Sequence, residues 1–369
     1  MKKNLLFLAT LVMIALFAQS AIAGENTDVN NRKDLDTYLW EINDDMSDDD
    51  YAKYSMRNFK FIQSIEPLID DESYLIYSVT YSHFEKGTAG KEDLEEAFDN
   101  LILEKSVADN TIFLWDANNM PIVDGEEYTE EELDNGKLDA YGFIPLLVEY
   151  LIDTPEAAKG NIIVISGGGF SDRGNNGEGY ECCEKFNELG YNTFLLQRRI
   201  EPYSTTDIYM DMQRAIRLVR YYAELNNWGG QDMIAAAGFS GGGMTIQGAV
   251  FECFGEKTPA DEGASSYVPD EIDAVCSDLD VAMPIYGAMA YMVNDENPNL
   301  PAFYFCVGTL DTALDNCQET YDLLCDKTPC RIDAIEGAKH GFGVGTASST
   351  PDGCREWPLW ADEFMQSLR

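Results

Sequence analysis

The sequence predicts an α/β fold in which helices cover both faces of a mostly parallel central sheet. Two observations support this prediction. From about Thr111 onwards, short apolar runs rich in β-branched residues alternate with longer stretches of helical periodicity. Glycines separate most of these runs. Alternating strands and helices are typical of parallel sheets, because each parallel connection has to cross a face of the sheet.

The elements follow in order from the spacing of the apolar residues. Strands are predicted at residues 111–115, 143–151, 161–165, 191–197, 233–237, 281–286, 302–307 and 331–335. Helices are predicted at residues 180–189, 206–226, directly after Ser240, and at 360–368. In such a sheet, side chains that follow the strands gather at its carboxyl edge, where ligands bind.

Residues 1–23 resemble a secretory signal peptide. Lys2 and Lys3 precede an apolar run from Leu5 to Phe17, and Ala21-Ile22-Ala23 forms a small-x-small cleavage site. The apolar run is too short to span a bilayer. We therefore expect cleavage after Ala23 and a mature protein in the extracellular or periplasmic space.

The remaining chain divides by composition into two predicted parts. Residues 24–108 are highly charged and show helical patches, which predict an acidic helical N-terminal module. Residues 109–369 carry the strand–helix alternation and are predicted to form the catalytic domain. No internal repeat is evident.

Charge and cysteine content limit the classes of partner. The formal net charge is −41, so the chain is not expected to bind nucleic acid or an anionic membrane surface. With only two His and no paired C-x-x-C, neither a metal site nor a cofactor is expected. Nine cysteines in an exported chain make some disulfides plausible, and the best candidates are Cys317, Cys325, Cys330 and Cys354.

A nucleophile turn is predicted at Ser240. The apolar run Met233–Ala237 leads into Gly238-Phe239-Ser240-Gly241-Gly242, a G-x-S-x-G pattern between a strand and a helix. Gly238 and Gly242 leave room for a turn too tight for side chains. The N–H of Gly241 begins the next helix, where it can face a developing oxyanion. By itself the pattern is weak, because a glycine-rich turn would look the same.

A serine nucleophile needs a general base and an acid that orients the base. His340 is the only histidine downstream of Ser240, and it follows the last predicted strand. Asp311 directly follows the strand at 302–307, and Asp315 is the second candidate for the acid. The chain order Ser240, Asp311, His340 differs from that of chymotrypsin and subtilisin.

The glycine run Gly167–Gly169 supplies a fourth part. It follows the strand at 161–165, so the N–H groups of Gly168 or Gly169 are predicted to share an oxyanion hole with Gly241. A flexible turn is the alternative for this run taken alone. Because all four parts occur in the expected order, a serine hydrolase is the favoured interpretation.

From about residue 111 to the C-terminus, the chain resembles bacterial α/β-hydrolases of the acetylxylan-esterase-like and feruloyl-esterase-like branch. Two positions depart from that pattern. Gly241 replaces the usual Ala, and Ser166 replaces Pro or His. The matching stretches are Ile163–Phe170, Glu178-Gly179, Gln197-Arg198-Arg199, the helical segment Asp211–Arg220, Gly238-Phe239-Ser240 and His340-Gly341-Phe342-Gly343.

The resemblance implies a secreted serine carboxylesterase that acts on a small-molecule or polysaccharide ester, with acetyl groups on xylan favoured. A feruloyl esterase and a serine peptidase of the same fold are alternatives within the enzyme class. A non-catalytic carbohydrate-binding or surface protein on a hydrolase scaffold is the alternative from another class. Both Ser240 and His340 are present, which favours an enzyme.

Overall fold

The computed structural model describes three isolated residues before residue 46. From residue 46 onwards it describes the chain with three gaps. The predicted signal peptide at residues 1–23 lies outside the described part, and so does the start of the predicted module at 24–108. The described residues are 35, 39, 42, 46–116, 119–125, 145–346 and 350–369.

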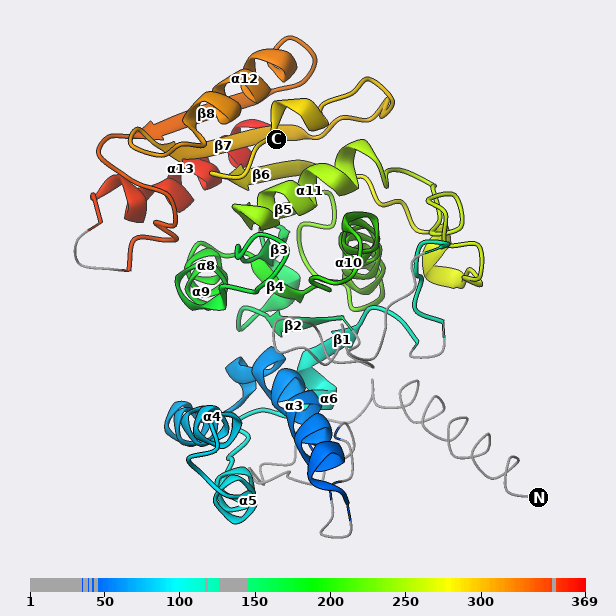
Figure 1. Ribbon diagram of the computed structural model, residues 1–369. Helices are drawn as coiled ribbons and strands as arrows, with labels where there is room; N and C mark the ends of the chain where they lie inside the picture. Colours follow the sequence, from blue (N-terminus) through cyan, green and yellow to red (C-terminus); the bar gives the residue numbers. More distant parts are fainter. Residues whose placement is uncertain are drawn as a thin grey trace. The chain divides into compact units, whose positions relative to one another are not determined.

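An eight-stranded sheet organises the described residues from 111 onwards (Figure 1). The strand order is β1-β2-β4-β3-β5-β6-β7-β8; β2 is antiparallel to both of its neighbours, β1 and β4, and all the other pairs are parallel. The predicted mostly parallel α/β fold is confirmed. The strands are β1 (Thr111–Phe113), β2 (Leu146–Tyr150), β3 (Asn161–Ile165), β4 (Asn192–Gln197), β5 (Ile234–Phe239), β6 (Val281–Ile285), β7 (Ala302–Gly308) and β8 (Cys330–Ile335).

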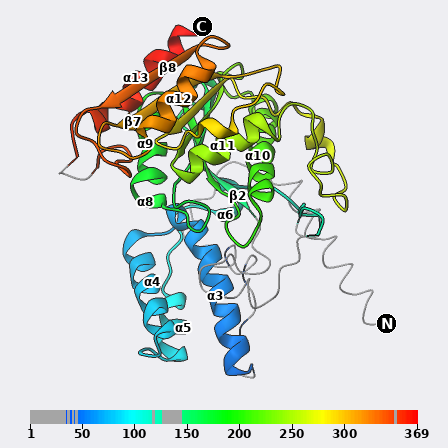
Figure 2. The ribbon, with the colours of Figure 1, turned by 45° about the horizontal axis from the view of Figure 1, so that its top comes forward.

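Helices cover both faces of the sheet (Figures 1 and 2). The aromatic rings of Phe186 in α9 and Trp357 in α13 meet on one face, 5.9 Å apart. Helices α10, α11 and α12 cover the other face, as right-handed crossovers require. The helices of this region are α8 (Asn175–Glu178), α9 (Tyr180–Glu188), α10 (Thr205–Leu225), α11 (Gly241–Phe251), α12 (Leu314–Leu324) and α13 (Gly353–Ser367).

Sequence features account for the main elements. Strands β3 and β7 are buried along their whole length, which explains why they lack polar alternation. Helix α10 begins with a capping box, in which Ser204 and Asp207 each accept the other's backbone N–H. The predicted start of the last helix at residue 360 is wrong. Helix α13 begins at Gly353 and contains Pro358, because the buried Trp357 anchors its first turns.

The N-terminal described residues are helical. They form α3 (Asp48–Ser64), α4 (Asp71–Glu85), α5 (Lys91–Asp99) and α6 (Val107–Asn110). By compactness, one unit comprises residues 1–40 and 68–110, and a second comprises 41–67 and 111–369. In the second unit, the Tyr180 hydroxyl donates to the Glu66 carboxylate over 2.6 Å. The predicted separate module at 24–108 stays a prediction.

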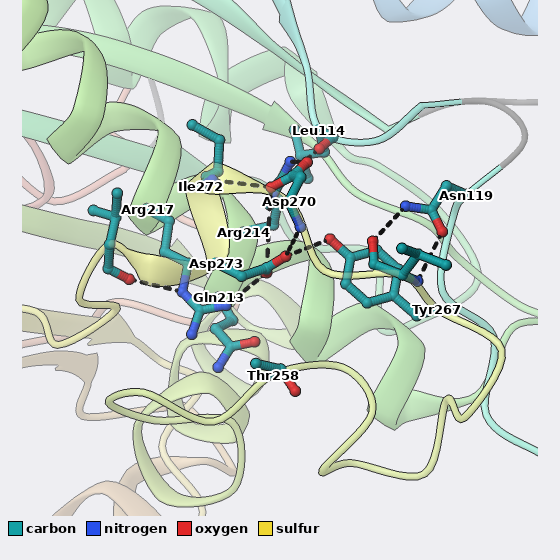
Figure 3. A network of polar contacts seen from close by, with 12 residues as sticks. Leu114, Asn119, Gln213, Arg214, Arg217, Thr258, Tyr267, Asp270, Ile272 and Asp273 are labelled. Atoms are coloured by element: carbon teal, nitrogen blue, oxygen red, sulfur yellow. Dashed lines mark hydrogen bonds and ion pairs between the residues drawn. The ribbon is translucent and has the colours of Figure 1, made fainter.

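A buried ionic network ties helix α10 to the segment between α11 and β6 (Figure 3). Arg214 forms a two-pronged pair with the Asp270 carboxylate, and its Nε donates to the Leu114 carbonyl. Arg217 pairs with Asp273 over 3.1 Å, and both side chains are almost inaccessible. Burial lowers the pKa of Arg217, although the Asp273 charge opposes this. The network anchors the long segment between α11 and β6, which has little regular secondary structure.

The nine cysteines are all present as free thiols, so the plausible disulfides among them are not formed in this structure. Cys317 and Cys354 are buried, whereas Cys325 is exposed. Burial raises the pKa of Cys317 and of Cys330 to about 11. Within the described ranges, no helix is long and apolar enough to cross a membrane.

Candidate active site

The strand order brings the predicted site residues together. From β3 the chain moves to β4 on one side, and from β4 it crosses back to β5 on the other side of β3. Strands β3 and β5 are therefore neighbours at the point where the direction of winding reverses, with Ile165 paired to Gly238. Ligands of open α/β sheets bind at such a switch point. Here it places the loop Gly167–Gly169, called the oxyanion loop below, beside Ser240.

Ser240 stands at the tip of a strained turn between β5 and α11. Its φ of 50° and ψ of −116° lie outside the regions that residues other than glycine favour. A Cβ at Gly238 would collide with the Gly242 carbonyl, and one at Gly242 would collide with the Ile165 carbonyl. Glycine is therefore required at both positions of the motif. The Ser240 side chain remains partly accessible.

Ser240, His340 and Asp311 form a continuous hydrogen-bonded chain. The His340 Nε2 lies 3.0 Å from the Ser240 Oγ. The His340 Nδ1 lies 2.9 Å from the Asp311 Oδ2 and 3.1 Å from its Oδ1. The His340 side chain is 47% exposed, whereas the Asp311 side chain is fully buried. Asp311 is thus the carboxylate at the imidazole, and Asp315 lies in the first turn of α12.

Two hydrogen bonds join the loop that carries Asp311 to the loop that carries His340. The Leu310 N–H donates to the Ala338 carbonyl over 3.0 Å, and the Gly337 N–H donates to the Thr309 hydroxyl over 2.9 Å. One Asp311 carboxylate oxygen also accepts the Ala313 N–H over 2.9 Å. Contacts of the loops after β7 and β8 therefore position Asp311 and His340 in addition to the hydrogen bonds that their own side chains form.

The glycines predicted to form the oxyanion hole come from two segments that lie close together. Gly168 and Gly169 have φ values of 106° and 64°, which only glycine adopts readily, and both are exposed. A Cβ at Gly241 would collide with the Gly169 carbonyl. The Gly in place of the usual Ala therefore lets the oxyanion loop approach the start of α11 closely. Because Gly241 is the first residue of α11, its N–H lies among the helix donors that have no intrahelical acceptor.

Three side chains that support this arrangement were not predicted to have a role. Arg198 is buried and donates to the Gly169 carbonyl over 2.7 Å. Glu178 accepts the Gly167 N–H over 2.7 Å, and it also accepts the Tyr286 hydroxyl over 2.7 Å. Arg198 and Glu178 lie in stretches that match the family pattern, which was the available signal. No motif marks Tyr286, although it ends a predicted strand.

The described residues contain no group of three or more His, Cys, Asp or Glu side chains that could hold a metal ion. The geometry at Ser240 instead supports nucleophilic catalysis. A hydroxyl, an imidazole and a buried carboxylate form one hydrogen-bonded chain, and Gly167 packs closely against Ser240. Such an arrangement can form and hydrolyse an acyl-enzyme.

Comparisons with known proteins bear on the fold. No protein-family profile matches the sequence, and no curated protein matches it either. Solved structures do match. An acetyl ester-xyloside bifunctional hydrolase from Caldicellulosiruptor lactoaceticus superposes with a TM-score of 0.54 at 22% identity, covering 70% of this chain and 96% of that one.

A thermophilic esterase from the Planctomycetes species Thermogutta terrifontis, with propionate bound, superposes with a TM-score of 0.50 at 19% identity. The match covers 68% of this chain and 95% of that one. Its apo form gives the same score and identity, with 67% and 96% covered. The chain has the α/β-hydrolase fold. The α/β-hydrolase region predicted from the motifs is thereby confirmed at the level of fold.

Proposed function

We propose that this α/β-hydrolase is a serine carboxylesterase. The observation that carries the proposal is the hydrogen-bonded chain from Ser240 through His340 to Asp311, located on a strained turn beside a glycine loop. Strained backbone at an exposed hydroxyl is a feature of nucleophile turns. The chemistry assigned to each residue follows from this geometry.

Acylation begins when the Ser240 Oγ attacks the carbonyl carbon of the ester and His340 Nε2 takes the hydroxyl proton. The Asp311 carboxylate keeps the other imidazole proton on Nδ1 and stabilises the imidazolium. The N–H groups of Gly241 and of Gly168 or Gly169 receive the oxyanion; one such donor commonly contributes about 10²- to 10³-fold in turnover. His340 then protonates the departing alcohol, and water, activated by the same imidazole, releases the acid.

The substrate class that we propose is an acetyl ester on carbohydrate, such as acetylated xylan. Support comes from the resemblance of the motifs to acetylxylan-esterase-like enzymes and from the structural similarity to the Caldicellulosiruptor acetyl ester-xyloside hydrolase. We further propose that the protein is exported after cleavage of residues 1–23. The sequence pattern of those residues supports this.

The test is acid release by the chain beginning at residue 24, with acetylated xylan, pectin and feruloylated oligosaccharide as substrates. Acetate from xylan is the expected product, and ferulate as the dominant product would replace the proposed acyl group. Ser240→Ala is the matched control. It should lower turnover of 4-nitrophenyl acetate by about 10⁶-fold while circular dichroism stays unchanged. A variant that keeps a third of the activity would refute the proposed mechanism.

A further inference from the structure

Two loops that border Ser240 come from distant parts of the chain. The oxyanion loop follows β3, and the loop His340–Gly343, called the histidine loop below, follows β8. The histidine loop approaches α8, because a Cβ at Gly343 would collide with the Gly177 carbonyl. The next residue after the loop, Val344, donates its N–H to the same carbonyl over 3.3 Å. The residue after Gly177 is Glu178, and its carboxylate connects α8 to both loops.

Each oxygen of the Glu178 carboxylate accepts from a different partner. Oε2 accepts the Gly167 N–H of the oxyanion loop over 2.7 Å. A Cβ at Gly167 would lie only 2.5 Å from this oxygen, so the glycine permits the contact. Oε1 accepts the Tyr286 hydroxyl over 2.7 Å. The carboxylate therefore uses both of its oxygens, and a neutral amide could not satisfy both donors.

Tyr286 continues the connection to the histidine loop. Its hydroxyl oxygen accepts the Gly343 N–H over 3.1 Å. Its ring packs against the His340 imidazole at 4.9 Å between centroids and against Phe342 at 4.6 Å. The hydroxyl is thus a donor to Glu178 and an acceptor from the histidine loop. Burial, reinforced by the Glu178 charge, raises the pKa of Tyr286 well above its usual value, so the hydroxyl stays protonated.

The backbone at Tyr286 is held in an unfavourable conformation. Its φ is +40°, which is rare for an aromatic residue, and the side chain is buried. Its N–H donates to the Cys306 carbonyl over 2.7 Å, and the preceding Ile285 carbonyl accepts the Ser240 N–H over 3.0 Å. Strain of this kind persists where the surroundings over-determine it and clusters at functional sites. The same strained segment thus borders the nucleophile turn and supports the imidazole.

We propose that Glu178 is a positioning residue that, through Tyr286, fixes the oxyanion loop and the histidine loop in one geometry around Ser240. This inference rests on the proposed function only in that Ser240 acts as a nucleophile beside an oxyanion hole. Glu178 itself touches neither the substrate nor the reacting atoms. Its loss should therefore reduce the rate of the chemical steps more than it affects substrate binding.

Glu178→Gln keeps the size of the side chain and removes one of its two acceptors. It should lower kcat for 4-nitrophenyl acetate by about tenfold to hundredfold, less than loss of a whole oxyanion donor, with KM changed by less than threefold. Tyr286→Phe keeps the ring against His340 and removes the hydroxyl. Because both variants break the same connection, the double variant should be no slower than the slower single variant.

Glu181→Gln is the matched control. The Glu181 carboxylate accepts the Gly177 N–H over 2.6 Å in the same turn, whereas the Gly167 N–H and the Tyr286 hydroxyl donate to Glu178. This variant should retain kcat within about twofold, and all variants should show a thermal midpoint within a few degrees of wild type. The proposal is overturned if Glu181→Gln loses as much kcat as Glu178→Gln, or if Glu178→Gln stays within twofold of wild type. Multiplicative effects in the double variant also overturn it.

A second readout separates this inference from the choice of substrate. The rate constant for phosphonylation of Ser240 by a fluorophosphonate depends on the nucleophile and the oxyanion hole, whatever the natural substrate. If wild type hydrolyses no carboxylic ester but is labelled, and Glu178→Gln is labelled at least tenfold more slowly, the proposed function fails and the positioning role stands. Equal labelling rates overturn the positioning role alone. A wild-type protein that neither turns over nor labels overturns both.

Discussion

Replacement of Asp311 by Asn gives a sharp test of the hydrogen-bonded chain, because the structure fixes how the new amide must lie. Asp311 Oδ1 accepts the Ala313 N–H over 2.9 Å, and the side chain is fully buried. In Asp311→Asn the amide oxygen therefore has to remain at the Oδ1 position. The amide NH₂ then occupies the Oδ2 position, 2.9 Å from the His340 Nδ1.

The NH₂ group at the nearer position, 2.9 Å from Nδ1 against 3.1 Å for the amide oxygen, favours the tautomer in which Nδ1 accepts. The imidazole then carries its proton on Nε2, which faces the Ser240 Oγ at 3.0 Å and can no longer accept the serine proton. The corresponding change in the serine-protease triad lowers turnover by about 10⁴-fold for this reason. We expect a loss of the same order in kcat for 4-nitrophenyl acetate at neutral pH, with the fold retained.

Asp315→Asn is the control, because Asp315 lies four residues further on and is exposed in the first turn of α12. It should stay within about twofold of wild type. Steady-state measurements of kcat at neutral pH compare the two variants with wild type, and thermal melts of both variants check that the fold is retained. The reasoning fails if Asp311→Asn keeps more than a tenth of the activity, or if Asp315→Asn is the more damaging change.

Three further predictions follow from other contacts. Gly241→Ala should lower kcat by tenfold or more, because the alanine Cβ would displace the Gly169 carbonyl. Unchanged esterase kinetics would show that the oxyanion loop can shift without loss of activity. Asp273→Ala leaves the Arg217 charge buried without its carboxylate and should cost about 3–5 kcal/mol in urea unfolding, whereas a cost under 1 kcal/mol would contradict this. Burial raises the pKa of Glu149 to about 7, so its ionisation destabilises the folded state as pH rises from about 4.5 through 7. Glu149→Gln should therefore raise the thermal midpoint more at pH 8 than at pH 5, and an equal shift at both would refute the assignment.

The parts of the site that could be predicted are those in which local sequence dictates local chemistry. The turn at Ser240 needs glycines at 238 and 242 because carbonyl groups occupy the space of a side chain, and this requirement is visible in the sequence. The order of Ser240, Asp311 and His340 is equally visible, since each follows a predicted strand. Buried strands such as β3 and β7 are recognisable because continuous burial leaves no polar alternation.

The sequence by itself determined the strand–helix alternation, the nucleophile turn and the candidates for the acid, because these depend on neighbours along the chain. Only the tertiary structure shows which of Asp311 and Asp315 contacts the His340 imidazole. They lie four residues apart, and the choice depends on which carboxylate faces the loop after β8. Tertiary structure alone also revealed the contact between Glu178 and Tyr286, which are 108 residues apart. Their contact exists because the sheet order brings the ends of β3 and β6 to one edge. The spacing of residues along the chain does not predict contacts between segments so far apart in sequence.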